Sequence, residues 1–100
     1  MGRSKTIFVN GALFYTKDAL TSHVRAMIAR YPVGFDIGGE DKAFCLALFG
    51  FHPEAQLKLA SGVTRIEVRL DRFGHKHFQI HRSDGTNDDI SWTWCVRHAA

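Results

Sequence analysis

Hydrophobic and polar residues alternate with a period of two through the C-terminal part of the chain. Every second residue is apolar in three stretches, which contain Ile66 and Val68, then Phe78 and Ile80, then Ile90, Trp92 and Trp94. Strict alternation is typical of strands that bury one face. The pattern predicts strands over residues 63–71, 76–82 and 89–96, and the short connections between them predict antiparallel neighbours.

The first helical pattern lies near the N-terminus. Apolar residues between positions 20 and 31 recur at i, i+4, i+7, i+8 and i+11, and Thr16 stands where an N-cap is needed. This spacing predicts a helix over residues 17–31 with one buried stripe. Pro32 ends it, because proline cannot continue a helix.

A second helix is predicted over residues 40–50. Glu40 and Asp41 suit its first turn, because carboxylates interact favourably with a helix N-terminus. His52-Pro53 terminates it, since the residue before a proline is pushed out of the helical region. One more short helical turn is expected over residues 54–59.

Residues 6–15 place Asn10-Gly11 between two β-prone runs, which predicts a two-stranded hairpin. Together these elements predict a single α+β domain over residues 1–100. Its antiparallel sheet holds the three C-terminal strands plus the N-terminal hairpin, and the two main helices pack on one face. Whether the hairpin pairs with the C-terminal strands stays open at this point.

Side chains alternate across a sheet, so the register must bring the apolar sets of all three strands to one face. Both tryptophans are then expected in the core. The inner rows of the predicted sheet are Ile66, Ile80 and Trp92, followed by Val68, Phe78 and Trp94.

The opposite face of this predicted sheet places arginine beside histidine twice. Its rows are Arg65, His81 and Ser91; Glu67, Gln79 and Thr93; and Arg69, His77 and Cys95. Like charges across a strand pair are unfavourable, so we expect neutral histidines and a face able to hold phosphate. The alternative is a solvated polar face in which Glu67 neutralises the arginines.

Composition refines this picture only slightly. With 45% hydrophobic and 23% charged residues, the chain can build a core and is unlike disordered sequences. A net charge of +3 favours a polyanionic partner.

No apolar run resembles a signal peptide or approaches the ~20 residues of a membrane span, so we expect a cytoplasmic monomer with no membrane partner. Cys45 and Cys95 are expected to be free thiols.

Neither metal binding nor catalysis is indicated by the spacing of the reactive residue types. Zinc-competent side chains are present but lack the spacing of a finger, knuckle or ribbon: His75, His77, His81, Cys95 and His98. Asp84, Asp88 and Asp89 are potential Mg²⁺ ligands, although Asp, Gly and Asn between strands are also ordinary turn chemistry. We therefore expect no cofactor, no metal site and no catalytic residue, and whether the chain is an enzyme stays open.

A set of motif residues runs through the C-terminal half: His52, Pro53, Lys58, Gly62, Phe78, Arg82, Asp84, Gly85, Asp89, Ser91 and Cys95. This set resembles a known family, the domain named after the plant protein defective-chloroplasts-and-leaves (DCL). The resemblance extends upstream more loosely and covers most of the chain. It departs from the family pattern at Ala60, Ile90, Trp92 and Trp94.

The resemblance implies an RNA context rather than an enzyme. Plant members of that family are linked to maturation of chloroplast ribosomal RNA, and bacterial members look like small stand-alone proteins of unknown function. The matched polar residues also admit a structural role, in which Arg82 forms a fork with Asp84 or Asp89 and ties two strands together.

The leading hypothesis from the sequence is a non-catalytic module that associates with RNA, and the resemblance implies a role in RNA processing. Its candidate contacts are Lys58, Arg65, Arg69, His77, His81 and Arg82. The alternative is a protein-interaction domain that docks a partner through the loop at residues 35–37 or through an uncovered helix groove. The third hypothesis is a metal-dependent nuclease that uses Asp84, Asp88 and Asp89.

Overall fold

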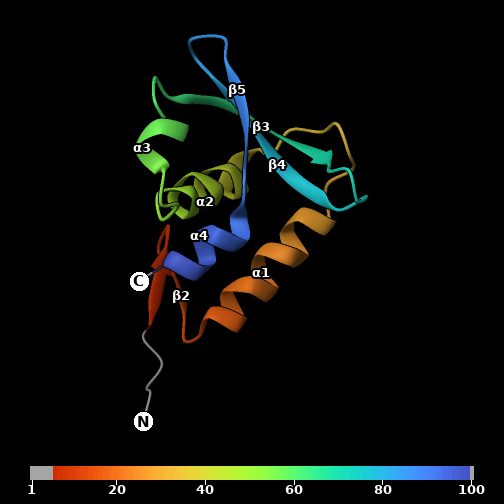
Figure 1. The fold of residues 1–100 in the computed structure, drawn as a ribbon. Coiled ribbons are helices and arrows are strands. Elements are labelled where there is room, and N and C mark those ends of the chain that lie inside the picture. Colours follow the sequence, from red (N-terminus) through yellow and green to blue (C-terminus); the bar gives the residue numbers. More distant parts are fainter. Residues whose placement is uncertain (1–5, 100) are drawn as a thin grey trace.

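The computed structural model describes residues 6–99. The helices gather on one side of a three-stranded sheet, and a short hairpin lies beyond them (Figure 1). The elements in chain order are β1 (Ile7–Val9), β2 (Ala12–Phe14), α1 (Lys17–Ala29), α2 (Gly39–Phe49), α3 (Ala55–Lys58), β3 (Val63–Leu70), β4 (Lys76–Arg82), β5 (Asn87–Ile90) and α4 (Trp92–His98). The mixed α+β class and the antiparallel pairing predicted from the sequence are confirmed.

Helix α1 begins as predicted. The Thr16 hydroxyl accepts a hydrogen bond of 3.0 Å from the Ala19 amide, and the residues of the predicted apolar stripe up to Ile28 are buried. The helix ends two residues early, because the amides of Arg30 and Tyr31 bond to carbonyls three residues back in a tightened last turn. Helix α2 and the short α3 also lie where the sequence predicts them.

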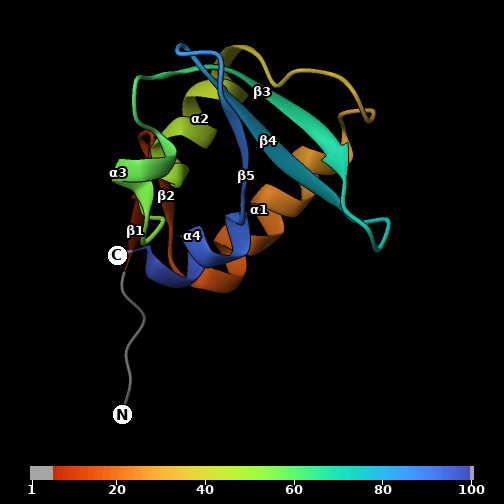
Figure 2. The same cartoon turned by 45° about the horizontal axis from the view of Figure 1, so that its top comes forward.

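The N-terminal hairpin forms a sheet of its own. Asn10 and Gly11 have φ values of 50° and 84°, and such positive angles at both central residues define the tight turns preferred in hairpins. Strands β1 and β2 contact α2 and α1 rather than the C-terminal strands (Figure 2). The hairpin therefore does not extend the three-stranded sheet, and the sheet face opposite the helices is not beneath it.

The pairing of β3 with β4 has the predicted register. Ile66 pairs with Ile80 and Val68 with Phe78, and all four side chains are buried. The register shifts at Thr64, which is exposed and donates through its hydroxyl to the His81 carbonyl. Residues 34–37 run along the outer edge of β3 and pair with it through three backbone hydrogen bonds of 2.7–2.9 Å.

The predicted third strand is wrong beyond Ile90. Strand β5 covers only Asn87–Ile90, so that Ile90 pairs with Phe78 and Asp88 pairs with Ile80. The chain then turns into α4, where the Ser91 hydroxyl accepts a hydrogen bond of 3.4 Å from the Trp94 amide. The positions of α4 that face the protein interior are spaced i, i+3, i+4 and i+7, and they are Trp92, Cys95, Val96 and Ala99.

This correction changes the surroundings of three predicted residues. Trp94 is not in the core, because 48% of its surface is exposed. Cys95 lies in the core between helices rather than on the polar sheet face, and Ser91 caps α4 instead of facing His81. The helix contacts α1 and α2, and this packing brings the C-terminal residues into the centre of the structure.

The core lies between the sheet and the helices. Phe49 of α2 and Phe78 of β4 are fully buried, with ring centroids 5.5 Å apart. Cys45 and Cys95 are free, as predicted, and burial raises the pKa of each thiol to about 12. Among residues 6–99, none of the helices has both the length and the apolar character that a membrane crossing requires.

Candidate functional site

Part of the polar face of the sheet carries cations that are already paired with carboxylates. Arg65 Nε lies 3.0 Å from Asp36 Oδ2, and its Nη2 lies 3.5 Å from Glu67 Oε1. His81 Nε2 is 3.0 Å from the same glutamate oxygen. Two of the predicted phosphate contacts are therefore already engaged by carboxylates. The cross-strand pair of Arg69 and His77 has no such acidic partner among the described residues.

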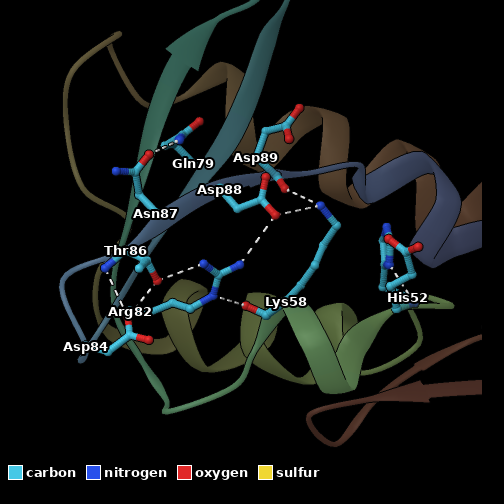
Figure 3. Close-up of polar contacts among 10 residues, drawn as sticks. His52, Lys58, Gln79, Arg82, Asp84, Thr86, Asn87, Asp88 and Asp89 are labelled. Atoms are coloured by element: carbon cyan, nitrogen blue, oxygen red, sulfur yellow. Dashed lines mark hydrogen bonds and ion pairs between the residues drawn. The ribbon is translucent and has the colours of Figure 1, made fainter.

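Lys58 and Arg82 lie away from this face, in a network at the end of the sheet beside α3 (Figure 3). The Lys58 ammonium donates to Asp88 Oδ2 at 3.0 Å and to the Asp89 carbonyl at 2.9 Å. Arg82 Nε donates to the Lys58 carbonyl at 2.7 Å, and its Nη2 lies 3.4 Å from the same Asp88 oxygen. These contacts tie α3 to β4 and β5.

The carboxylate that partners Arg82 differs from the two that the sequence suggested. Asp88 takes that role, while Asp84 closes the adjoining turn by accepting hydrogen bonds from the amide and hydroxyl of Thr86. Those hydrogen bonds lower the pKa of Asp84. Gly85 and Gly62 have φ values near 90°, a conformation that glycine adopts without strain.

The three aspartates proposed for a metal-dependent nuclease make contacts with different residues. Asp84 binds Thr86, Asp88 binds Lys58 and Arg82, and Asp89 contributes its carbonyl to Lys58. Within residues 6–99, no group of three or more His, Cys, Asp or Glu side chains is arranged to hold a metal ion. The geometry therefore places these residues in the scaffold of the sheet end.

Beside this network lies a cleft of about 340 Å³, which we call the His52 cleft. It is formed by residues at and just before the start of α3, the end of β5 and the start of α4. Figure 1 shows where these three elements lie. Five of its lining residues belong to the set that carries the resemblance stated above. The lining residues are His52, Pro53, Glu54, Lys58, Asp89, Ser91 and Trp94.

The imidazole of His52 has a defined proton arrangement. Its Nδ1 accepts a hydrogen bond of 3.0 Å from the Glu54 amide, so the proton of the neutral ring is on Nε2. Burial and the nearby Lys58 charge both lower the pKa of His52 from its ordinary 6.5. The ring is thus neutral near pH 7 and has one N–H available as a donor.

We expect His52 to titrate below pH 6.5, in a ¹H–¹⁵N NMR titration of the imidazole nitrogens. A lowered pKa means that the folded state binds fewer protons than the unfolded state. The stability that this provides is present above pH 6.5 and is lost as the pH falls through the folded-state value. In a Lys58→Met variant the midpoint should move toward 6.5, and a midpoint above 6.5 in the native protein would contradict the described environment.

A larger cleft of about 800 Å³ adjoins the first, and we call it the basic cleft. Its lining includes Arg25 of α1, His75 of the β3–β4 connection, and Lys76 and His77 of β4, together with the carboxylates of Asp71 and Asp89. The Arg25 guanidinium lies 6.0 Å from the centre of the Trp92 ring. The sequence did not indicate that Arg25, an outward residue of the first predicted helix, shares a cleft with Lys76, because α1 and β4 are about fifty residues apart and only their packing joins them.

The turn between β3 and β4 extends the basic cleft. Arg72 and Phe73 lie in this turn, and 75% of the Phe73 surface is exposed. The turn is held by Asp71, whose carboxylate accepts hydrogen bonds from the amides of Phe73 and His75. These hydrogen bonds lower the pKa of Asp71. An exposed aromatic ring beside cations is an arrangement that can stack on an unpaired base.

Comparison with known proteins identifies the fold and its relatives. The family model described as "Protein of unknown function (DUF3223)" matches residues 25–96, which include every described residue that lines the two clefts. The solution NMR structure of an uncharacterized protein from Rhodospirillum rubrum is similar over 95% of this chain and 91% of its own, with a TM-score of 0.86 and 30% sequence identity. No curated protein matches the chain.

Proposed function

The chain belongs to the DUF3223 family of proteins of unknown function, and we propose that residues 1–100 act as a single non-catalytic RNA-binding module. The basic cleft is the observation that carries this proposal. It places Arg25, Lys76 and two histidines in one concave surface, whose lining also contains Asp71 and Asp89. Arg69 near the end of β3 and Arg72 in the β3–β4 turn are close in the chain to this lining, and with them the arginines and lysines of this region outnumber the two carboxylates. An excess of cations attracts a phosphate backbone.

Two further features support RNA as the polyanion. The resemblance of residues 52–95 to the DCL domain implies an RNA context, and the net charge of +3 has the required sign. Phe73 and Trp94 are exposed aromatic rings near the two clefts. Unpaired bases of single-stranded RNA stack on such rings, whereas the bases of a duplex are not accessible to them.

The proposed surface differs from the flat sheet face that the sequence alone favoured. On that face, Asp36 and Glu67 already neutralise Arg65 and His81, so that a phosphate would have to displace a carboxylate. His77 belongs to both surfaces, and Arg69 is its cross-strand partner. Lys58 and Arg82 contribute to the proposed function indirectly, because their contacts support the adjoining His52 cleft.

Fluorescence anisotropy with labelled single-stranded RNA, at 50 and 200 mM salt, tests the proposal. About four phosphate contacts would give a log–log salt slope of about −3 for a single strand. The double variant R69Q/R72Q should bind more weakly and reduce the magnitude of the slope by about 1.4, since it removes two cations and each phosphate contact contributes about 0.7 on a single strand. K17Q/K42Q removes the same charge elsewhere and should retain most of the affinity. Absence of binding at 50 mM salt would overturn the proposal.

One observation favours the protein-interaction alternative. Val33 and Phe35 lie on the segment that runs beside β3, and Leu70 lies at the end of β3; all three are apolar and about half exposed. Exposed apolar side chains that form a patch mark interaction sites. Capture of a protein that survives nuclease treatment and is lost in a Phe35→Ser variant would favour this alternative.

A further inference from the structure

The His52 cleft lies at the end of the basic cleft. The two share Asp89 and Ser91 in their walls, so an extended chain that occupies the basic cleft can continue directly into the smaller one. A volume of about 340 Å³ is near the lower limit of small-molecule sites, which start at roughly 300 Å³. The space is suited to a single flat group.

Trp94 supplies an aromatic wall for this cleft. About half of its surface is exposed, and Arg97 Cζ lies 5.6 Å from its ring centre. The His98 ring stacks on Trp94 with a centroid separation of 5.7 Å and an interplanar angle of 26°. These neighbours hold the indole in place, and a held indole is a good platform for stacking a base.

The polar groups aimed at this space include two hydrogen-bond donors, His52 and Lys58. His52 presents Nε2–H, because its Nδ1 is occupied by the Glu54 amide. Lys58 uses two of its three ammonium protons on Asp88 and Asp89, which leaves one N–H for a ligand. Asp88 and Asp89 also fix the ammonium in position, so it reaches the ligand without a large loss of side-chain freedom.

We propose that the His52 cleft binds one guanine base of a bound RNA strand, with the base stacked on Trp94 and with His52 and Lys58 donating to O6 and N7. This inference rests on the proposed RNA-binding function and assigns it a base preference. Guanine presents two adjacent acceptors on that edge, whereas adenine presents one acceptor and an amino donor. The amino group of adenine would therefore face one of the two protein donors without forming a hydrogen bond. Pyrimidines have no N7 to accept one.

The test uses a short labelled RNA of otherwise identical uridines with one variable base, in equilibrium binding at fixed salt. Guanine and inosine should bind equally, because both have O6 and N7 and differ only in the 2-amino group. Adenine and 7-deazaguanine should bind about tenfold more weakly or worse, which corresponds to the lower end of the range for a paired base contact. Equal affinity for guanine and 7-deazaguanine would overturn the assignment.

Protein variants locate the effect. His52→Phe keeps a planar ring but removes the Nε2–H donor, so the preference for guanine over adenine should shrink severalfold while adenine affinity is retained. Trp94→Ala should weaken binding of every base, and Trp94→Phe should restore part of the affinity. The R69Q/R72Q variant provides the matched control, because it should lower affinity for all sequences with an unchanged guanine preference. A guanine preference that persists in both His52→Phe and Trp94→Ala would place the base elsewhere.

The outcomes separate this inference from the function on which it rests. Salt-dependent binding with equal affinity for all bases would leave the RNA module intact and overturn the guanine site. Amide shifts at residues 69–77 without shifts at His52 and Trp94 would have the same consequence. Failure of every oligonucleotide to bind at 50 mM salt would overturn both.

Discussion

Replacement of Phe78 by alanine is expected to lower the free energy of unfolding by about 3–5 kcal/mol. Phe78 is fully buried at the centre of the sheet, and its ring packs at 60° against that of Phe49. Removing the ring loses its transfer free energy and leaves a cavity between β4 and α2, which neighbouring side chains fill only in part. Because small proteins are stable by roughly 5–15 kcal/mol, this loss approaches the total.

Urea denaturation followed by circular dichroism measures this effect. Phe73→Ala makes the same chemical change at a site where 75% of the ring is exposed, so it should alter stability by about 0.5 kcal/mol or less. If Phe78→Ala is too unstable to purify, Phe78→Leu should show a smaller loss in the same direction. Equal effects of the two alanine variants would contradict the described core.

Replacement of Arg82 by methionine is expected to cost about 2 kcal/mol of stability. The methionine keeps much of the aliphatic length but loses the guanidinium, whose side chain is only 12% exposed. The Lys58 carbonyl then loses its donor at 2.7 Å, and Asp88 retains Lys58 as its one cationic partner. The partial exposure of Asp88 keeps the cost below that of a fully buried ion pair.

Chemical denaturation of R82M against R72M, an exposed arginine in the β3–β4 turn, isolates this contribution. The second variant should change stability by about 0.5 kcal/mol or less. A double-mutant cycle with Asp88→Asn should give a coupling energy of about 0.5 kcal/mol or more, since the two groups are in direct contact. A coupling energy of zero would show that Arg82 acts through the Lys58 carbonyl and the Thr86 hydroxyl, to which it also donates, rather than through Asp88. R82M stability equal to that of the native protein would contradict a stabilising role.

The elements that depend on neighbouring residues could be predicted from the sequence. The Asn10-Gly11 turn, the Thr16 cap and the apolar spacing of α1 each act within a few residues, and each is found where predicted. The register of β3 with β4 was also predictable, because a short turn joins the two strands and both bury alternate residues.

Residues 91–98 show where this reasoning fails. The alternation of Ile90, Trp92 and Trp94 suggests a strand, and tryptophan is common in strands. The helical spacing from Trp92 to Ala99 was present in the same residues but covers less than three turns, so the two periods compete over a short segment. Packing of α4 against α1 and α2 decided between them, and no local pattern contains that contact.

Individual residues of the candidate site could be predicted from the sequence, but the contacts between them could not. Lys58 and Arg82 were identified as candidates, although their common partner is Asp88 and they support a cleft instead of bordering the polar sheet face. The pairing of Arg65 with Asp36 depends on the path of residues 34–37 beside β3, which the sequence does not indicate.

By itself, then, the sequence determined the α+β class, the positions of α1, α2, β3 and β4, and a positive charge that suits a polyanion. These follow from periodicity, turn residues and composition, which act over short distances. Only the tertiary structure decided that α4 is a helix, that Trp94 is exposed and that Arg25 meets the β3–β4 connection. Those outcomes depend on burial of apolar surface between segments far apart in the chain, and the same packing forms both clefts.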